Sequence, residues 1–388
     1  MDIPESLFGQ ITVEEFLRDY WQKRSLLVRS AWPQFLSPLE PEDLIQLAQR
    51  DDTDSRLILR KGGKYEWEAR FGPFDEDEIT GLGESHWTLL VQEVDRMIPE
   101  VSALLRAVPF LSNWRIDDVM VTYATDGGGV GAHIDNYDVF LLQGLGKRKW
   151  EIEEGPAQDE ELVPDLDVRI LSHFEPTHTW ILEPGDMLYL PPRIAHRGTA
   201  VGDCLTYSIG CRAPSRSDLV SAYLEDLLEA GMDETPFSGG ERSQEFESGL
   251  IAMELKEFAH RAIAESIRDT DRFTRWMGRY LSRPSRGWLP PEPESVITSS
   301  KLRERLEEGA HIRASSVSMV MHDRCSDGSL VLFVGGEEHN IETRHEKALV
   351  SLTGRHGLAL DRLPQDKEFT DMICDLINQG YLVICSSS

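Results

Sequence analysis

The stretch that decides the fold is Thr125-Asp126-Gly127-Gly128-Gly129-Val130-Gly131-Ala132-His133-Ile134-Asp135. Alternate residues of a β-strand point to the same face, so His133 and Asp135 can reach one metal ion. The third ligand that we expect is His196, which lies just after a predicted strand and ends the run Leu190-Pro191-Pro192-Arg193-Ile194-Ala195-His196.

Two histidines and one carboxylate leave three adjacent positions open on an octahedral ion, and this facial triad is typical of non-haem Fe(II) oxygenases. The His-x-Asp pair alone is a weak signal, but the spacing around it is more specific. Gly127 lies six residues before His133, and Gly185, Pro191 and His196 follow the pattern Gly-x5-Pro-x4-His. Both patterns are typical of the cupin barrel, here with aspartate in place of the second histidine of the first pattern.

Two other interpretations of these residues stay open. The histidines could be core residues that hydrogen bonds satisfy without any metal. The glycines at 127–129 could form a phosphate-binding loop, but the stretch lacks the Gly-Lys-Ser/Thr ending and precedes a strand rather than a helix. The metal site is the favoured interpretation.

A second candidate site lies in residues 147–153, which alternate between two faces of one predicted strand. The odd-numbered residues are charged and solvated, and the inward, apolar face carries Arg148, Trp150 and Ile152. A buried guanidinium needs a carboxylate partner, and no acidic residue is interleaved on this face. The distal carboxylate of 2-oxoglutarate fits this need, and an aspartate or glutamate from another strand is the alternative.

The composition is that of a globular protein with a strongly acidic balance. The chain has 388 residues, with 40 Lys and Arg against 68 Asp and Glu, so its formal net charge is −28. This charge argues against a protein that binds mainly to the nucleic-acid backbone or to an anionic membrane, and it is compatible with a basic protein partner. The five cysteines show no CxxC spacing. With no signal-like start and no membrane-length apolar run, we expect a cytoplasmic protein.

Short runs rich in β-branched and aromatic residues predict an antiparallel barrel between about 117 and 213. We expect its strands at 118–123, 138–142, 148–152, 178–182, 187–190 and 205–209. The residues before about 115 mix helix patterns with polar connections, and Thr12 to Glu15 have the spacing of a capping box.

After Pro214 the apolar residues recur at helical spacing, until a proline-rich linker near 284–293. The last 90 residues alternate helix, strand pair, helix and strand, which suits a small winged-helix domain. The sequence therefore predicts an α+β multidomain protein. Its parts are an oxygenase-type barrel with an N-terminal helical elaboration at 1–213, a helical region at 214–290 and a winged-helix domain at 291–388.

These motifs resemble those of the JmjC-type ribosomal oxygenases. The likeness covers essentially the whole chain and is greatest to the bacterial members that hydroxylate an arginine of large-subunit ribosomal protein sixteen. It rests on His133-Ile134-Asp135-Asn136-Tyr137-Asp138-Val139-Phe140, Gln143-Gly144, Gly146-Lys147-Arg148-Lys149-Trp150, Glu183-Pro184-Gly185-Asp186 and Tyr207-Ser208-Ile209-Gly210. The resemblance implies a JmjC/cupin double-stranded β-helix barrel, a helical dimerisation region that makes a homodimer, and the winged-helix domain.

The resemblance also implies roles for individual residues. His133, Asp135 and His196 would bind Fe(II), and Arg148 would bind the distal carboxylate of the cosubstrate 2-oxoglutarate. Dioxygen is the other cosubstrate. Small polar residues surround the cosubstrate in this family, and Thr122 and Thr206 lie on suitable strands.

The implied reaction is hydroxylation of the β-carbon of an arginine in a basic ribosomal protein. Candidates for substrate contacts are Asp126, Tyr137, Asp138 and Ser208, which lie close in sequence to the metal-binding strands; an ordinary turn or barrel role is the alternative for each. Hydroxylation of a histidine is the first alternative function, and a non-enzymatic cupin that binds or senses a partner is the second. Residues 297–388 hold ten Lys and Arg against fourteen Asp and Glu, so we expect protein contacts rather than DNA binding from the winged helix.

Overall fold

A computed structural model describes residues 4, 7–61, 67–156, 161–164, 166, 168–231, 235–238, 251–284, 290, 293, 295–354 and 357–385. The chain divides into two compact units, Met1–Ala213 and Pro214–Ser388. Most of the predicted linker lies outside the described residues. The division of the second unit at residue 290 therefore stays a prediction.

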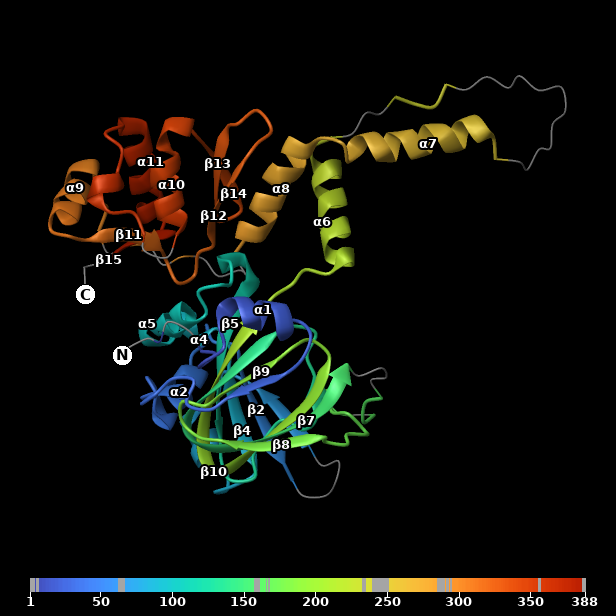
Figure 1. Ribbon diagram of the computed structural model, residues 1–388, viewed down its shortest axis with the longest axis vertical. Coiled ribbons are helices and arrows are strands. Elements are labelled where there is room, and N and C mark those ends of the chain that lie inside the picture. The colour runs from blue at the N-terminus through green and yellow to red at the C-terminus, as the bar shows by residue number, and fades with distance from the viewer. Residues whose placement is uncertain are drawn as a thin grey trace. The chain divides into compact units, whose positions relative to one another are not determined.

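The first unit is built on one ten-stranded sheet whose strands pair antiparallel (Figure 1). The strand order is β1-β9-β7-β10-β5-β4-β2-β3, and β6 pairs with β10 while β8 pairs with β7. The strands are β1 (Leu26–Val28), β2 (Ser55–Arg60), β3 (Trp67–Phe71), β4 (Trp87–Val91), β5 (Ile116–Ala124), β6 (His133–Ile134), β7 (Val139–Pro156), β8 (His178–Leu182), β9 (Met187–Leu190) and β10 (Ile194–Cys211).

The predicted barrel is confirmed, with two differences: two predicted strands are one, and four further strands join the sheet. The runs at 138–142 and 148–152 are two halves of the single long strand β7. The pairing of β7 with β10 shifts in register between Val201 and Leu205, and such irregularities allow long strands to bend. Figure 1 shows the sheet curling into the barrel.

The four further strands are β1 to β4, which lie where helix patterns and polar connections were expected. All five residues of β4 are buried. A strand that is covered on both faces shows no alternation of polar and apolar residues, so its sequence carries no period-2 signal.

Alternate residues of β9 divide the unit into two cores. Met187 and Tyr189 belong to a large cluster with the N-terminal helices, where the Tyr189 and Phe16 rings lie 4.9 Å apart. Leu188 and Leu190 belong to a separate cluster with Trp150 and Ile152 of β7. The barrel therefore keeps an apolar inner cluster while its other face supports the helices.

Short helices precede the main barrel strands. The predicted capping box is confirmed at the start of α1. The Thr12 side chain accepts the Glu15 backbone N–H, and the Glu15 carboxylate accepts the Thr12 backbone N–H. The helices are α1 (Val13–Asp19), α2 (Pro41–Ala48), α3 (Glu76–Thr80), α4 (Val94–Met97), α5 (Pro99–Ser102) and the 3₁₀ turns η1 (Ala103–Ala107) and η2 (Asn113–Arg115).

Asp95 in α4 is a buried carboxyl group whose Oδ1 accepts the Val119 backbone N–H at 2.8 Å. Burial raises its pKa from 3.8 to about 7, and the nearby Asp118 carboxylate adds to the effect. The folded chain therefore keeps this proton between about pH 4 and pH 7, where the unfolded chain releases it. Stability linked to Asp95 is fully present below about pH 4 and falls as the pH rises through this window.

We expect Asp95→Asn to lose this part of the pH dependence, because asparagine does not ionise and can still accept the Val119 N–H. Each unit of pKa difference is worth about 1.4 kcal/mol, so the gain of the variant over the natural protein between pH 4 and pH 8 is at most about 4 kcal/mol. Urea unfolding at both pH values measures it. Asp51→Asn, at an exposed turn, is the control, and parallel pH profiles for all three proteins would contradict the prediction.

The last 90 residues keep the expected helix, strand pair, helix and strand, with two further strands before the pair and a further helix after it. The helices of the second unit are α6 (Arg216–Glu229), α7 (Met253–Ser266), α8 (Thr270–Ser282), α9 (Ser299–Glu307), α10 (Glu346–Thr353) and α11 (Lys367–Asn378), with 3₁₀ turns η4 (Thr343–His345) and η5 (Leu360–Arg362). β11 (His311–Ala314) pairs with β15 (Leu382–Cys385), while β12 (Val320–Arg324), β13 (Leu330–Val334) and β14 (Glu337–Ile341) form a three-stranded sheet.

Helix α8 packs on the three-stranded sheet of this unit. A Cβ at Gly278 would lie 2.4 Å from the Phe333 ring, so only glycine allows the helix to approach β13 this closely. The tight turn of the predicted hairpin is made by Gly335 and Gly336, which both have positive φ. None of the helices in the described residues is long and apolar enough to cross a membrane.

Candidate metal centre

Three side chains from the barrel converge as the sequence predicted. His133 on β6 and His196 on β10 are direct cross-strand partners, and Asp135 follows β6. Their ligand atoms all lie within 4.8 Å of one another. The Asp135 Oδ2 atom lies 3.6 Å from His196 Nε2 and 3.9 Å from His133 Nε2.

The hydrogen bonds of the two histidines orient them for a metal. His133 Nδ1 lies 3.1 Å from the Gly131 carbonyl oxygen, and His196 Nδ1 lies 2.9 Å from that of Ile194. A carbonyl oxygen only accepts, so each Nδ1 carries the proton and each Nε2 presents a lone pair. Two lone pairs and a carboxylate then face one another, and a cation between them relieves their repulsion.

Burial favours the neutral form of His196. Burial lowers the pKa of His196, and the neighbouring His133 lowers it further. The neutral imidazole is the form that binds a metal ion. His133 and Asp135 keep about a quarter of their side-chain surface exposed (24% and 22%), whereas His196 keeps 4%. The site is therefore closed on the β10 side and open on the side of β6.

Arg148 lies in the barrel wall, with 3% of its surface exposed. Its Nη1 donates to Thr122 Oγ1 at 2.8 Å and to Thr206 Oγ1 at 3.3 Å. Its Nε is buried without a partner. No carboxylate in the described part of the chain forms an ion pair with it, so the interior donor set fits a ligand carboxylate.

The two threonines hold the guanidinium from one side. Thr122 of β5 and Thr206 of β10 are cross-strand partners, as their predicted positions on neighbouring strands allow. Thr206 in turn donates to Oε1 of Gln143 on β7 at 3.1 Å. Gln143 was not predicted as part of the site, although a fully buried amide within an apolar strand is itself a signal of a polar partner.

The four predicted substrate-contact residues lie in different surroundings. Tyr137 is half-exposed beside Asp135, and partial burial together with that carboxylate raises its pKa. Ser208 is buried on β10, two residues from Thr206 and on the same face of the strand. Asp126 accepts the Gly202 N–H at 2.8 Å in a turn of the first unit.

Asp138 is the fourth of these residues, and its contacts lie within the fold. Its carboxylate accepts the Tyr189 hydroxyl at 2.5 Å, the Gln22 amide at 3.1 Å and Arg115 at 3.3 Å, and 1% of its surface is exposed. All four therefore stay predictions. We carry Tyr137 and Ser208 forward, because the contacts of Asp138 lie within the first unit and the exposed Asp126 is bonded to the Gly202 turn.

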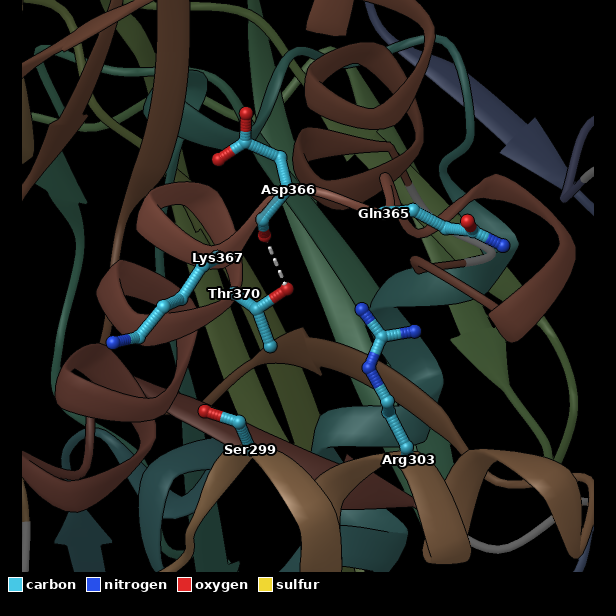
Figure 2. Close-up of a pocket in the computed structure, with 6 residues that line it drawn as sticks. All are labelled: Ser299, Arg303, Gln365, Asp366, Lys367 and Thr370. Carbon is cyan, nitrogen blue, oxygen red and sulfur yellow. Dashed lines mark hydrogen bonds between the residues drawn. The ribbon is translucent and has the colours of Figure 1, made fainter.

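A separate hollow of about 400 Å³ lies in the second unit, where Figure 2 shows its six lining residues. Its charges are mixed, with Arg303 and Lys367 near Asp366. The Asp366 carboxylate already accepts from Arg344 at 2.6 Å and from the Phe369 N–H at 3.0 Å. The hollow contains none of the three converging ligands and takes no part in the proposal below.

A barrel of this topology with a His–Asp–His group and a buried arginine that has no carboxylate partner in the described residues is typical of cupin-type metal-binding proteins. The JmjC domain family matches residues 103–219, and the ROXA-like winged-helix family matches residues 264–383. The chain belongs to the ribosomal oxygenases, because it is 32% identical over 371 residues to the ribosomal protein uL16 3-hydroxylase of Escherichia coli, covering 95% of this chain and 96% of that protein.

Other relatives agree with this assignment. A probable ribosomal oxygenase of Haemophilus influenzae is 41% identical over 224 residues, which cover 58% of this chain and 55% of that protein. The crystal structure of E. coli YcfD superposes with a TM-score of 0.85 at 29% identity, covering 97% of this chain and 98% of that chain. The structure of YcfD with cobalt and 2-oxoglutarate has a TM-score of 0.84, with the same identity and coverage. The predicted family, barrel and winged helix are confirmed.

Proposed function

We propose that this protein is an Fe(II)- and 2-oxoglutarate-dependent dioxygenase that hydroxylates the β-carbon of an arginine in ribosomal protein uL16 in the cytoplasm. The observation that carries the proposal is the pairing of two sites in one barrel. Three metal-binding atoms converge at His133, Asp135 and His196, and a buried guanidinium without a carboxylate partner lies on the neighbouring stretch of β7.

The chain's own residues have distinct tasks in this proposal. The Nδ1–H groups of His133 and His196 hold the rings so that each Nε2 faces the metal. Arg148, supported by Thr122 and Thr206, binds the distal carboxylate of 2-oxoglutarate. When bound, iron, 2-oxoglutarate and dioxygen supply the oxidising power that places one oxygen atom in a C–H bond, with release of succinate and carbon dioxide.

The surroundings of the site serve positioning and exclusion. The inner cluster of β7, β8 and β9 keeps water from the buried side of the metal ligands. Tyr137 and Ser208 are candidates to contact the substrate side chain near the metal. A net charge of −28 favours encounter with a strongly basic protein.

The test of this proposal is anaerobic loading with Fe(II) and 2-oxoglutarate, followed by oxygen and recombinant uL16, with tandem mass spectrometry of the product. We expect one added oxygen atom on an arginine and an equal yield of succinate. Oxidation mapped to a histidine would favour the alternative histidyl hydroxylase. Absence of succinate under all conditions would favour a non-enzymatic binding module.

A homodimer built through α6 and α7 is also part of the proposal. The face of α6 that packs on α8 carries Tyr223 and Leu227. Val220, Leu224 and Leu228 form a second stripe, and they are 59%, 49% and 67% exposed. Such a stripe at i, i+4 and i+8 is one helix face that has no cover within the described residues.

Helix α7 supports the same proposal. None of its 14 residues is buried, and its exposed apolar side chains include Met253, Leu255 and Ile263. A helix of this length is marginal in water unless it packs on a partner. A second copy of this chain would supply the missing surface, in line with the dimerisation region that the family resemblance implies.

We expect the double variant Leu224→Asp/Leu228→Asp to sediment as a monomer at concentrations where the natural protein is a dimer, because the charges would be buried unpaired in the interface. Sedimentation velocity measures the change. Val350→Asp, at an equally exposed apolar position on α10, is the control and should leave the dimer intact. Equal dimerisation of the natural protein and the double variant would exclude this face as the interface.

A further inference from the structure

The pairing of β7 with β10 places one residue pair midway between the two candidate sites. Arg148 lies opposite Ala200, Trp150 opposite Gly198, and Ile152 opposite His196. Residues two apart on a strand share a face, so Arg148, Trp150 and His196 all belong to the inner face of the barrel. The Trp150–Gly198 pair therefore lines the wall between the metal ligands and the guanidinium.

Trp150 carries an unused hydrogen-bond donor. The side chain is 4% exposed, and its Nε1 is buried without a partner, as is Nε of Arg148. A buried N–H without an acceptor destabilises the protein, so such groups are rare unless a ligand completes them. Both donors lie in neighbouring side chains of one inner face, where one acceptor group of a bound ligand can complete them.

The local packing brings these two side chains together. The Arg148 Cζ atom lies 5.0 Å from the centre of the Trp150 ring, within the range of a cation–π contact. A Cβ at Gly198 would lie 2.6 Å from Arg148 Nε and 2.9 Å from Trp150 Cη2. The absence of a side chain at 198 is what leaves room for the guanidinium beside the indole.

We propose that Trp150 is a further cosubstrate-binding residue, whose indole N–H donates a hydrogen bond to the same carboxylate that Arg148 binds. This inference rests on the proposed function and deepens it, since it names a second donor for the distal carboxylate. The ring has a second task, because it holds the guanidinium in place by the cation–π contact. Together the two donors select a 2-oxo dicarboxylic acid over a 2-oxo monocarboxylic acid.

The test measures binding without turnover, with zinc(II) in place of iron because zinc is redox inert. Calorimetric titration of the zinc-loaded protein with 2-oxoglutarate is compared between the natural protein and Trp150→Phe, which keeps an aromatic ring and removes the N–H. We expect about tenfold weaker binding of 2-oxoglutarate by the variant, the usual scale for one hydrogen bond to a charged group. Zinc affinity should not change.

Two comparisons make the result specific. 2-Oxobutyrate lacks the distal carboxylate, so it should bind the natural protein and Trp150→Phe equally; equal weakening of both acids would mean that Trp150 acts by packing and would overturn the proposal. Trp32→Phe removes an equally buried indole from the other core and should bind 2-oxoglutarate like the natural protein.

The possible failures are distinguishable. If the natural, zinc-loaded protein binds 2-oxoglutarate and Trp150→Phe binds it equally well, the inference about Trp150 is wrong and the proposed function stands. If the natural protein does not bind 2-oxoglutarate at all, the proposed function is wrong.

An NMR spectrum of the natural protein tests the same proposal without any variant, so its result does not depend on whether Trp150→Phe folds. The chain has nine tryptophans, and their indole N–H signals are resolved by ¹⁵N NMR. We expect one of them to move downfield on addition of 2-oxoglutarate but not of 2-oxobutyrate. Nine unchanged signals under saturating 2-oxoglutarate would overturn the proposal.

Discussion

Replacement of His196 by alanine is expected to abolish hydroxylation of uL16, with a loss of more than about a thousandfold in rate. His196 is the most buried of the three converging ligands, and its Nε2 lies 3.6 Å from Asp135 Oδ2. Without it, the metal would be held by one imidazole and one carboxylate, both partly exposed. Calorimetry measures the loss of metal affinity, and mass spectrometry of the product measures the loss of hydroxylation.

The matched control is His173→Ala. His173 Nε2 also faces a carboxylate, that of Glu161 at 3.7 Å, but its side chain is 83% exposed. The same substitution at this surface pair should leave metal affinity and product yield unchanged. A His196→Ala variant that keeps full turnover would show that these three residues are not the metal ligands.

The barrel and the convergence of His133, Asp135 and His196 were predictable because their signals are local in the sequence. His133 and Asp135 are two residues apart, and the Gly-x5-Pro-x4-His pattern ties His196 to the turn before β9. Pairing between β6 and β10 then brings the two histidines opposite each other.

Other parts of the site depend on register, which the sequence pattern does not contain. Trp150 was placed on the inner face from the alternation of β7, but its position between Arg148 and His196 follows only from the pairing with Gly198. Gln143 joins Thr206 for the same reason. Tyr137 and Asp138 are neighbours in sequence, yet one lies beside Asp135 and the other is enclosed by Tyr189 and Arg115.

The second large effect is expected from Arg148→Ala, which should raise the concentration of 2-oxoglutarate needed for half-maximal rate by about a hundredfold. Truncating one partner of a buried charge pair costs about 2–5 kcal/mol of binding free energy, and the ligand carboxylate would face only Thr122, Thr206 and the indole of Trp150. The rate at saturating 2-oxoglutarate should fall much less, because the metal ligands are untouched. Initial rates over a range of 2-oxoglutarate concentrations separate the two effects.

Arg197→Ala is the matched control, because Arg197 lies on β10 directly after His196 but points to the other face. It is bonded to Glu151 at 2.9 Å, and its own side chain is 40% exposed while that of Glu151 is 10% exposed. Without Arg197, Glu151 keeps Lys149 as a cationic partner at 3.4 Å. A thermal readout distinguishes the two arginines further. Saturating 2-oxoglutarate should raise the melting temperature of the zinc-loaded natural protein and of Arg197→Ala, since a ligand stabilises the state that binds it.

The zinc-loaded Arg148→Ala protein should gain little from the same ligand. Its own stability without ligand should not fall, because the substitution removes a buried charge that has no carboxylate partner in the described part of the fold. A variant that melts well below the natural protein in the absence of 2-oxoglutarate would indicate that Arg148 is mainly structural. An unaltered requirement for 2-oxoglutarate would contradict its assignment to the distal carboxylate.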